Sequence, residues 1–419
     1  MKAKTKTPWR EGAPKPSYPE LKGRVDADVA IIGGGITGLL SAYQLAKEGK
    51  SVVVLEAEEL GEGATEYTTA FLTEIIDTNL SDLEGTYGKE NAQRIVRSHR
   101  EAITYIEGIV NDENIKCEFK RVSNYMYAGT HKEAKDLSDE LEAGKKLDVD
   151  IARGTGQLGF TNYGYLEVKN QAKFHPLKFI YGVAQATLQH GGKIFQKSEA
   201  IAIHADNGTK VVRTRKGEVY APKVVSATYS PFGEPAGLFL KKGMYVTYMH
   251  EIVVDKKIPE AIYEDMENPY HYFRVDIRNK KTHIIIGGED HRRDVPIAPE
   301  KNFAALKTYI DEHFGESYTV VREWTGPILE PIDGLAFIGP YGESGIIYTF
   351  GFSGNGMTYA GIAARLIADY VEGRRSEYHE LYAADRIPSP KQLLIKGRDY
   401  FEELAGGALK NATTHKRRK

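Results

Sequence analysis

The sequence predicts a mixed α/β (α+β) fold, in which a domain with a parallel sheet is interleaved with a domain built on an antiparallel sheet. A short apolar strand at 28–32 runs into a glycine turn, a helix and a second strand at 51–56. Segments with period-two alternation follow in the middle of the chain, and a strand–turn–helix pattern returns at 333–372. Because strand–helix–strand units give parallel sheets and hairpins give antiparallel ones, the chain combines both architectures.

The length and the glycine content set the first limits. The chain has 419 residues, which suits two or three domains. Its 42 glycines are 42/419, or about 10%, against an average near ~7%. This excess is too small for a fibrous or low-complexity chain, and it indicates several places where the backbone turns tightly or approaches another group closely.

Cysteine content and charge exclude several classes of site. Cys117 is the one cysteine, and 56 basic side chains balance 58 acidic ones. A single thiol excludes a disulfide scaffold, a thiolate zinc site and a cysteine-ligated iron–sulfur cluster within this chain. His283 and His291 have no partner at metal-ligand spacing, so no metal site is predicted. The net charge of -2 gives no reason to expect nucleic acid as a partner.

The sequence contains no recognisable secretory or membrane-spanning segment. Residues 1–26 are rich in proline and basic residues, lack the apolar run of a secretory signal, and are expected to form a surface arm. Two uncharged stretches, 29–46 and 344–364, contain too much glycine for a spanning helix and fit a strand, a turn and the start of a helix. A cytoplasmic location without a membrane span is therefore expected, and the basic end at 416–419 is interpreted as a solvated terminus.

The first glycine turn has the G-x-G-x-x-G spacing of a Rossmann-type dinucleotide site. Gly33 permits the tight turn after the strand, Gly35 lets the backbone approach a pyrophosphate, and Gly38 lets the helix pack on the sheet. The helix N-terminus offers unpaired N–H groups to the phosphates. Glu56 ends the next strand, where a carboxylate accepts ribose hydroxyls and disfavours a 2′-phosphate. The motif alone does not choose between FAD and NAD.

A second match to the same spacing, at 154–159, has a different context. The residues that follow it, FTNYGYLEV, contain no apolar helix and no acidic strand end. We therefore expect a loop there, because the bare spacing is a weak signal.

Periodicity predicts the remaining elements. After the segment KIFQ, an antiparallel meander that ends in a buried strand is expected at about 201–228, and further strands are expected at 241–290. Helices are expected where apolar residues recur at helical spacing, at about 36–47, 90–110, 131–147, 176–190, 301–314 and 357–372.

Several stretches taken together resemble a known family. They are VAIIGGGITGLLSAYQLAKEGKSVVVLEA from Val29, GEGATEYTTA at 61–70, DGLAFIGP at 333–340 and GFSGNGMTYAGIAARLIADYVEG at 351–373. This combination resembles the D-amino-acid-oxidase-like FAD-dependent oxidoreductases, the group that includes glycine oxidase, sarcosine oxidase and gamma-glutamylputrescine oxidase. PWREG near the start, FHPLKF and GGEDH are similar to a bacterial subgroup in which some members carry a C-terminal Rieske domain. The resemblance covers about residues 8 to 385 and implies FAD.

The resemblance also implies roles for particular residues. It places the FAD pyrophosphate at the first glycine turn, the adenosine ribose at Glu56 and the start of the last long helix at the pyrimidine edge of the flavin. A helix N-terminus there would stabilise the negative charge of the reduced ring. The cofactor-binding residues expected on this basis are Gly33, Gly35, Ile36, Thr37, Gly38, Glu56, Ala57, Gly63, Ala64, Thr65, Thr68, Thr69, Ala70, Ala227, Thr228, Gly354, Asn355, Gly356 and Met357.

The chain departs from the family pattern at several points. Family members that act on α-amino acids usually carry an arginine just before the DG motif, where this chain has Ile328 and Leu329. Without that two-donor clamp for a carboxylate, a simple α-amino acid substrate is not expected, whereas Glu330 either attracts a cationic amine or lies on the surface. Tyr67 stands where the subgroup has a histidine. Cys117 lies far from the C-terminal motif, so FAD is expected to be noncovalent, and an iron–sulfur electron acceptor would be a separate protein.

In such enzymes the flavin carries the chemistry, and the protein positions a C–H bond of the substrate against it. Tyr248, His250, Tyr272 and Arg274 are the candidate catalytic residues on the substrate side, because they come from predicted strands in which residues two apart share a face. Arg274 is the nearby cation that could form an ion pair with an acidic group of the substrate. The alternative is that Arg274 is a solvated side chain at the end of a strand.

These features predict an FAD-dependent enzyme that oxidises the CH–NH bond of an amine or N-substituted amino acid to an imine, with electrons passing to oxygen or to a separate carrier. A dehydrogenase that reacts poorly with oxygen, and a flavin-containing binding or assembly protein without turnover, are the alternatives. The expected organisation is an N-terminal arm at 1–26, an FAD-binding domain at 27–85, 170–235 and 326–385, a substrate domain at 86–169 and 236–325, and a C-terminal helix and basic tail at 386–419.

Overall fold

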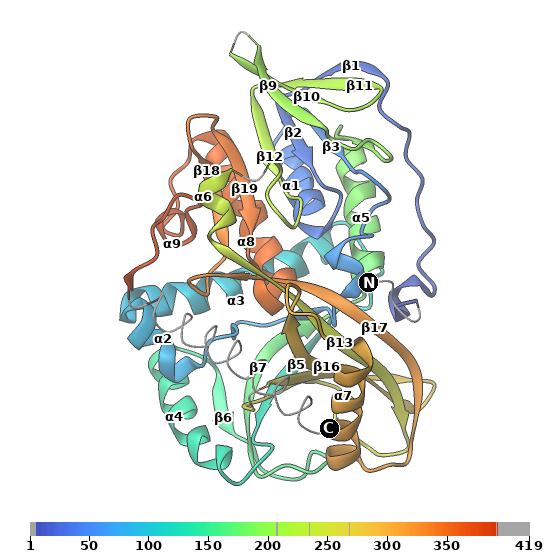
Figure 1. The fold of residues 1–419 in the computed structure, drawn as a ribbon, viewed down its shortest axis with the longest axis vertical. Helices are drawn as coiled ribbons and strands as arrows, with labels where there is room; N and C mark the ends of the chain where they lie inside the picture. The colour runs from blue at the N-terminus through green and yellow to red at the C-terminus, as the bar shows by residue number, and fades with distance from the viewer. Residues whose placement is uncertain (1–5, 207, 234, 268, 391, 393–419) are drawn as a thin grey trace, which may run out of the picture.

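The computed structural model describes residues 6–390 and 392, apart from 207, 234 and 268, so most of the predicted C-terminal helix and tail lies outside the described residues. Figure 1 shows two parts stacked along the long axis, the upper built around a six-stranded sheet and the lower around a larger one. None of the described helices combines the length and the apolar composition needed to cross a bilayer. The mixed α/β architecture predicted from the sequence is confirmed.

The six-stranded sheet forms the centre of the upper part. It is parallel except at its edge pair, β18 and β19, and its inner strands β2 and β3 are buried along their whole length. Continuous burial on both faces is what a covered parallel sheet requires. The strands, in sheet order, are β18 (Phe337–Tyr341), β19 (Ile346–Phe350), β12 (Lys223–Ser226), β2 (Val29–Ile32), β3 (Val52–Leu55) and β8 (Lys193–Phe195).

Two different layers cover this sheet. Ile31 and Val54 pack toward the helices α1 (Ile36–Lys47), α5 (Pro176–Gln189) and α8 (Gly356–Glu372). Ala30 and Leu55 belong instead to a cluster with residues of a small second sheet, which lies at the upper end of the molecule (Figure 1). That sheet consists of β1 (Gly23–Asp26), β11 (Gly217–Ala221), β10 (Thr209–Arg213) and β9 (Ala202–Asp206).

A nine-stranded sheet forms the lower part. Its pairs are antiparallel apart from β14 with β5, and a bulge interrupts the β13–β16 pairing between Val246 and Tyr248. The strands are β17 (Tyr318–Pro331), β13 (Lys242–Val254), β16 (Lys281–Arg292), β15 (His271–Arg278), β14 (Ile262–Asp265), β5 (Lys120–Tyr127), β7 (Tyr165–Lys173) and β4 (Phe71–Leu72), with β6 (Ile151–Arg153) also on β7.

The predicted helices lie near their expected positions, whereas α2, α6 and α9 were not predicted. The long amphipathic helix is α3 (Lys89–Asp112), which packs on α8, and α7 (Pro299–Phe314) covers one face of the nine-stranded sheet. Since β4 and parts of β7 and β17 join this sheet, it extends across three of the expected domain boundaries, and the division into two domains stays a proposal. The other helices are α2 (Leu80–Tyr87), α4 (Glu133–Lys146), α6 (Ala236–Phe239), α9 (His379–Tyr382) and the 3-10 turns η1 (Pro8–Arg10), η2 (Ala64–Tyr67) and η3 (Ser353–Asn355).

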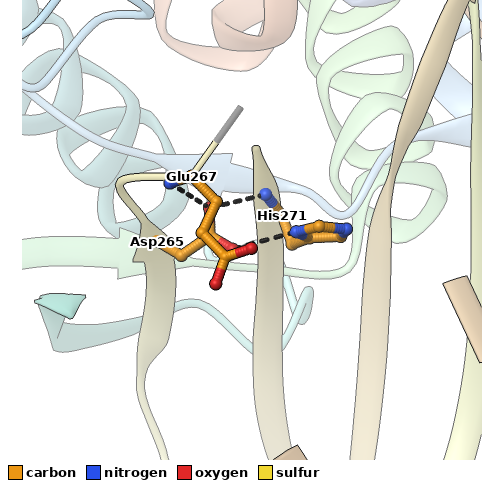
Figure 2. Close-up of side chains that lie close together, drawn as sticks. All are labelled: Asp265, Glu267 and His271. Atoms are coloured by element: carbon orange, nitrogen blue, oxygen red, sulfur yellow. Dashed lines mark hydrogen bonds and ion pairs between the residues drawn. The ribbon is translucent and has the colours of Figure 1, made fainter. Parts of the chain in front are cut away.

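Asp265 organises the turn between β14 and β15 (Figure 2). Its carboxylate accepts hydrogen bonds from the backbone N–H groups of Glu267 and His271, at 3.3 and 2.7 Å, and from His271 Nδ1 at 2.9 Å. The Tyr309 hydroxyl of α7 donates to the same carboxylate at 2.9 Å, and the Tyr309 ring stacks on His271. Together these contacts fasten the turn to α7.

Two carboxylates set the pKa of His271. Burial alone would lower it, but ion pairs with Asp265 and with Glu289, whose carboxylate lies 3.4 Å from Nε2, raise the pKa to about 9. Asp265, Glu267 and His271 could each offer one metal ligand within 4.8 Å of the others. His271 Nδ1 is already hydrogen bonded to Asp265, and this bond explains why the two side chains lie together. The absence of a metal site stays a prediction.

Replacing His271 by Asn is expected to destabilise the protein most at low pH. The pKa of His271 is about 9 in the folded protein and about 6.5 in an unfolded chain. The stability it contributes is therefore fully present below pH ~6.5 and is lost as the pH rises through ~9. The shift corresponds to at most about 3 kcal/mol.

The measurement is the free energy of chemical unfolding of the wild type and His271→Asn at pH 6, 7.5 and 9.5. His204→Asn, at an exposed position on β9, is the control. A difference between wild type and His271→Asn that did not change with pH would contradict the assignment of a charged, buried imidazolium.

Candidate cofactor and substrate site

The first glycine turn lies at the carboxyl end of β2. Gly33 has φ +113°, and a Cβ there would lie 2.4 Å from the carbonyl oxygen of Ala227. A Cβ on Gly38 would lie 1.9 Å from the carbonyl oxygen of Gly33. At Gly35, by contrast, a Cβ would meet only Thr65 Oγ1 within 4 Å in the described structure. Gly33 and Gly38 are thus required by packing, whereas Gly35 leaves the start of α1 open to a ligand such as a pyrophosphate.

Gly34, to which the sequence assigned no role, is also required. A Cβ at this position would lie 2.6 Å from Leu60 Cδ2 and 2.9 Å from Glu56 Cβ. The glycine therefore lets the turn pack closely against the residues that follow β3.

Glu56 lies beside this turn at the end of β3. Its Oε2 accepts the N–H of Gly34 at 2.6 Å and its Oε1 accepts the N–H of Glu58 at 2.9 Å. Burial raises the pKa of the carboxyl, and these backbone hydrogen bonds oppose the rise. Each carboxylate oxygen retains further acceptor capacity, which suits the two hydroxyls of a ribose.

The predicted segment from Gly63 to Ala70 forms a wall beside the start of α1. Thr65 Oγ1 accepts the N–H of Ile36 at 3.1 Å, so this wall is joined to the first turn of α1. The N-terminal segment holds it from outside, since Trp9 Nε1 donates to the carbonyl of Thr68 at 2.8 Å and Arg10 pairs with Glu66.

Arg274 holds the end of this wall from the other side. Its Nη1 donates to the carbonyls of Thr69, Ala70 and Phe174 at 3.0, 3.3 and 2.9 Å, and its Nε and Nη2 donate to Asp276. All three nitrogens of the buried guanidinium are occupied by the protein itself. Its contacts therefore do not support the predicted ion pair with an acidic group of the substrate. In this fold Arg274 links the wall to β15 and to Phe174.

The C-terminal motif and the end of β12 meet the same edge of the sheet. Ala227 follows β12 and donates its N–H to Ile32 at 2.8 Å, beside Gly33. α8 begins at Gly356, where Asp77 accepts the N–H of Gly354 at 2.8 Å and the side-chain amide of Asn355 at 3.0 Å. Because β2, β12, β3 and β19 run parallel, their carboxyl ends bring the predicted cofactor-binding segments together at one edge.

Opposite this edge, one face of the nine-stranded sheet carries polar and aromatic side chains. The Tyr272 hydroxyl lies 2.9 Å from Thr247 Oγ1, and the rings of Tyr270 and Tyr272 stack with centroids 5.8 Å apart. The Tyr270 hydroxyl donates to Asp290 Oδ2 at 3.0 Å. Burial and the charges of Asp290 and Asp77 raise the pKa of both tyrosines. This face of the sheet therefore lies near the Asp77 carboxylate at the start of α8.

Tyr248 and His250 lie on the other face of the sheet. Tyr248 packs edge-on against Phe303 of α7 at 4.9 Å, and His250 contacts the same ring at 5.5 Å. The adjacent Thr247 points instead to Tyr272. The structure thus separates both residues from Tyr272, and their contacts do not support the predicted catalytic role.

The sequence analysis missed Asp77 and Asp290 as site residues. Asp290 lies in the GGEDH stretch that contributed to the family resemblance, and this was the one signal that could have drawn attention to it. Asp77 belongs to no motif. Ile328 and Leu329, which stand in place of the expected arginine, are buried in β17.

The second glycine match forms the predicted loop. A Cβ on Gly154 would lie 1.8 Å from the ring of Tyr165, and Gly159 has φ +86°, so packing and conformation explain these glycines. The loop borders an open surface cleft of about 580 Å³, and no described helix starts there as α1 does after Gly35.

Comparison with known proteins agrees with this geometry. Residues 28–370 match the family described as FAD dependent oxidoreductase. A Bacillus subtilis protein named as a Rieske 2Fe-2S iron-sulfur protein is 28% identical over 96% of this chain and 80% of its own length. Gamma-glutamylputrescine oxidoreductase of Escherichia coli is 27% identical over 89% of this chain and 90% of its own length.

The fold is similar to that of solved structures. Glycine oxidase from Geobacillus kaustophilus superposes with a TM-score of 0.73 at 19% identity, covering 87% of this chain and all of that one. The glycine turn, Glu56 and the start of α8 all fall within the matched residues. The chain therefore belongs to the FAD-dependent oxidoreductase family, as its motifs predicted.

Proposed function

We propose that this chain binds FAD noncovalently between the ends of its parallel strands and the nine-stranded sheet, and uses it to oxidise the CH–NH bond of an amine or N-substituted amino acid to an imine. The observation that carries the proposal is the convergence of the glycine turn, Glu56, the wall 63–70 and the start of α8 on one edge of the sheet. Gamma-glutamylputrescine oxidoreductase and glycine oxidase, which are similar to this chain, are named for nitrogen-containing substrates.

In this proposal each group of residues has a separate task. Bound FAD supplies the redox chemistry by accepting two electrons from the carbon next to the substrate nitrogen. The open backbone at Gly35 and the N–H groups of α1 hold the pyrophosphate, and Glu56 accepts the adenosine ribose. The N–H groups at the start of α8 that Asp77 does not occupy would stabilise negative charge on the reduced ring. Tyr270 and Tyr272 border the substrate on the opposite side.

The charges near the site favour an amine over a simple α-amino acid. Ile328 and Leu329 are buried where an arginine clamp would stand, and Arg274 is occupied by protein groups. The charged groups that raise the pKa of the Tyr270 hydroxyl include Asp290, Asp77 and Glu330, all negative. Any substrate carboxylate placed here would be repelled, so of the two proposed substrate classes the amine is favoured over the N-substituted amino acid.

Replacing Glu56 by Gln is expected to weaken FAD binding by about 10-fold or more, because a charged acceptor of ribose hydroxyls is lost. The measurement is the FAD dissociation constant of apoprotein followed by flavin fluorescence. Glu167→Gln is the control, since Glu167 lies on β7 near the second glycine loop, where its carboxylate accepts a hydrogen bond from the Ser123 hydroxyl at 2.6 Å. Equal FAD affinity in wild type and Glu56→Gln would refute the ribose assignment.

Anaerobic addition of substrate is expected to bleach the flavin absorbance of the FAD-loaded protein. We expect bleaching by one or more amines or polyamines and none by simple α-amino acids, for the electrostatic reason given above. Bleaching by no compound would favour the binding or assembly protein instead. Stopped-flow mixing of the reduced protein with oxygen then separates an oxidase, which reoxidises quickly, from a dehydrogenase that needs a separate carrier.

A further inference from the structure

We propose that Asp290 is a specificity-determining residue that binds a second, protonated nitrogen of the substrate, so that the preferred substrates are diamines or polyamines. This inference rests on the proposed function, because it assigns the substrate class of the same site. It starts from three neighbouring groups, the Asp290 carboxylate and the rings of Tyr270 and Tyr272.

Asp290 is held in place but retains binding capacity. Its Oδ2 accepts the Tyr270 hydroxyl at 3.0 Å. Its Oδ1 is buried and forms no hydrogen bond of full geometry with the described residues, although the Thr247 hydroxyl lies near enough to oppose the rise in the pKa of Asp290. A buried carboxylate oxygen without a partner is costly, and an ammonium group at this point would remove the cost.

The adjacent tyrosines suit a cation as well. Tyr270 and Tyr272 stack on one another, and Tyr270 keeps 36% of its surface exposed although protein surrounds its hydroxyl. The accessible face of a phenol ring attracts an ammonium group within about 6 Å. The carboxylate and the ring therefore bind the same kind of ligand from two sides.

In the described structure Asp290 forms no ion pair, although the charge of His271 on the neighbouring turn lowers its pKa. Asp77 at the start of α8 adds negative charge near this face, and Glu264 lies directly across the ladder from Tyr272. Burial raises the pKa of Asp290 to about 7, with the hydroxyls of Thr247 and Tyr270 opposing the rise and Asp77 adding to it. His271 is the cation on the neighbouring turn, and it is bound by Asp265 and Glu289.

The site would then treat the two nitrogens of its substrate differently. The nitrogen next to the oxidised carbon must be neutral, because its lone pair forms the new C=N bond as the C–H bond breaks. The remote nitrogen stays protonated and pairs with Asp290. A monoamine lacks this second contact, and a simple α-amino acid brings a carboxylate that the nearby acids repel.

The test compares 1,4-diaminobutane with n-butylamine, which lacks the second nitrogen, on the FAD-loaded protein without oxygen. Binding is followed by the perturbation of the flavin spectrum, and turnover by the rate of flavin reduction. We expect the wild type to bind the diamine at least 10-fold more tightly, the range for a charge-assisted contact. In Asp290→Asn this preference should fall to about one.

Asp294→Asn is the matched control, because Asp294 is a solvent-exposed acid four residues away that pairs with Arg292. It should keep the preference for the diamine. Equal binding of the two amines by the wild type, or a preserved preference in Asp290→Asn, would overturn the assignment of Asp290, and the wild-type comparison decides even if the variant fails to fold. Diamine binding that depends on Asp290 without flavin reduction would instead leave the binding site standing and refute the proposed oxidation.

Discussion

The guanidinium of Arg274 joins the parts of the protein on which the site depends. It donates to Thr69 and Ala70 in the wall beside α1, to Phe174 after β7 and to Asp276 on its own strand, and it lies over the ring of Trp9 from the N-terminal segment. Burial alone would raise the pKa of Asp276, but Arg274, Lys173 and Arg278 lower it well below its usual range, so the carboxylate is charged. Removing one partner of such a buried pair costs about 3–5 kcal/mol.

The contacts of Arg274 hold two surfaces of the protein next to each other, the edge of the parallel sheet and one face of the nine-stranded sheet. On one side, the carboxyl ends of parallel strands and the start of α1 and α8 present backbone N–H groups and Glu56, which suit the constant chemistry of a dinucleotide. On the other, the nine-stranded sheet presents side chains that differ from strand to strand, among them Tyr270, Tyr272 and Asp290. The fold can therefore keep one cofactor while the sheet sets the substrate.

Local signals in the sequence predicted the elements of the first βαβ unit, whereas the cofactor contacts assigned to it stay a prediction. The glycine turn, the helix at 36–47 and the acid at the end of β3 lie within one βαβ unit. Within such a unit, the spacing along the sequence determines which residues lie side by side. The substrate side was not predictable in this way. Whether Thr247 or Tyr248 faces the site depends on register, which the bulge between Val246 and Tyr248 shifts, and a shift of one residue exchanges the two faces of a strand. The partners of Arg274 in the wall lie more than 200 residues away, so its anchoring role left no local pattern.

An experimental structure of the FAD-loaded protein tests the central claim most directly. The account predicts density for the pyrophosphate at the start of α1, for the ribose at Glu56 and for the flavin ring between the start of α8 and the side chains of Tyr270 and Tyr272. Arg274 should keep its contacts to Thr69 and Ala70. A flavin ring turned away from the nine-stranded sheet, or bound at the cleft beside the loop 154–159, would contradict it.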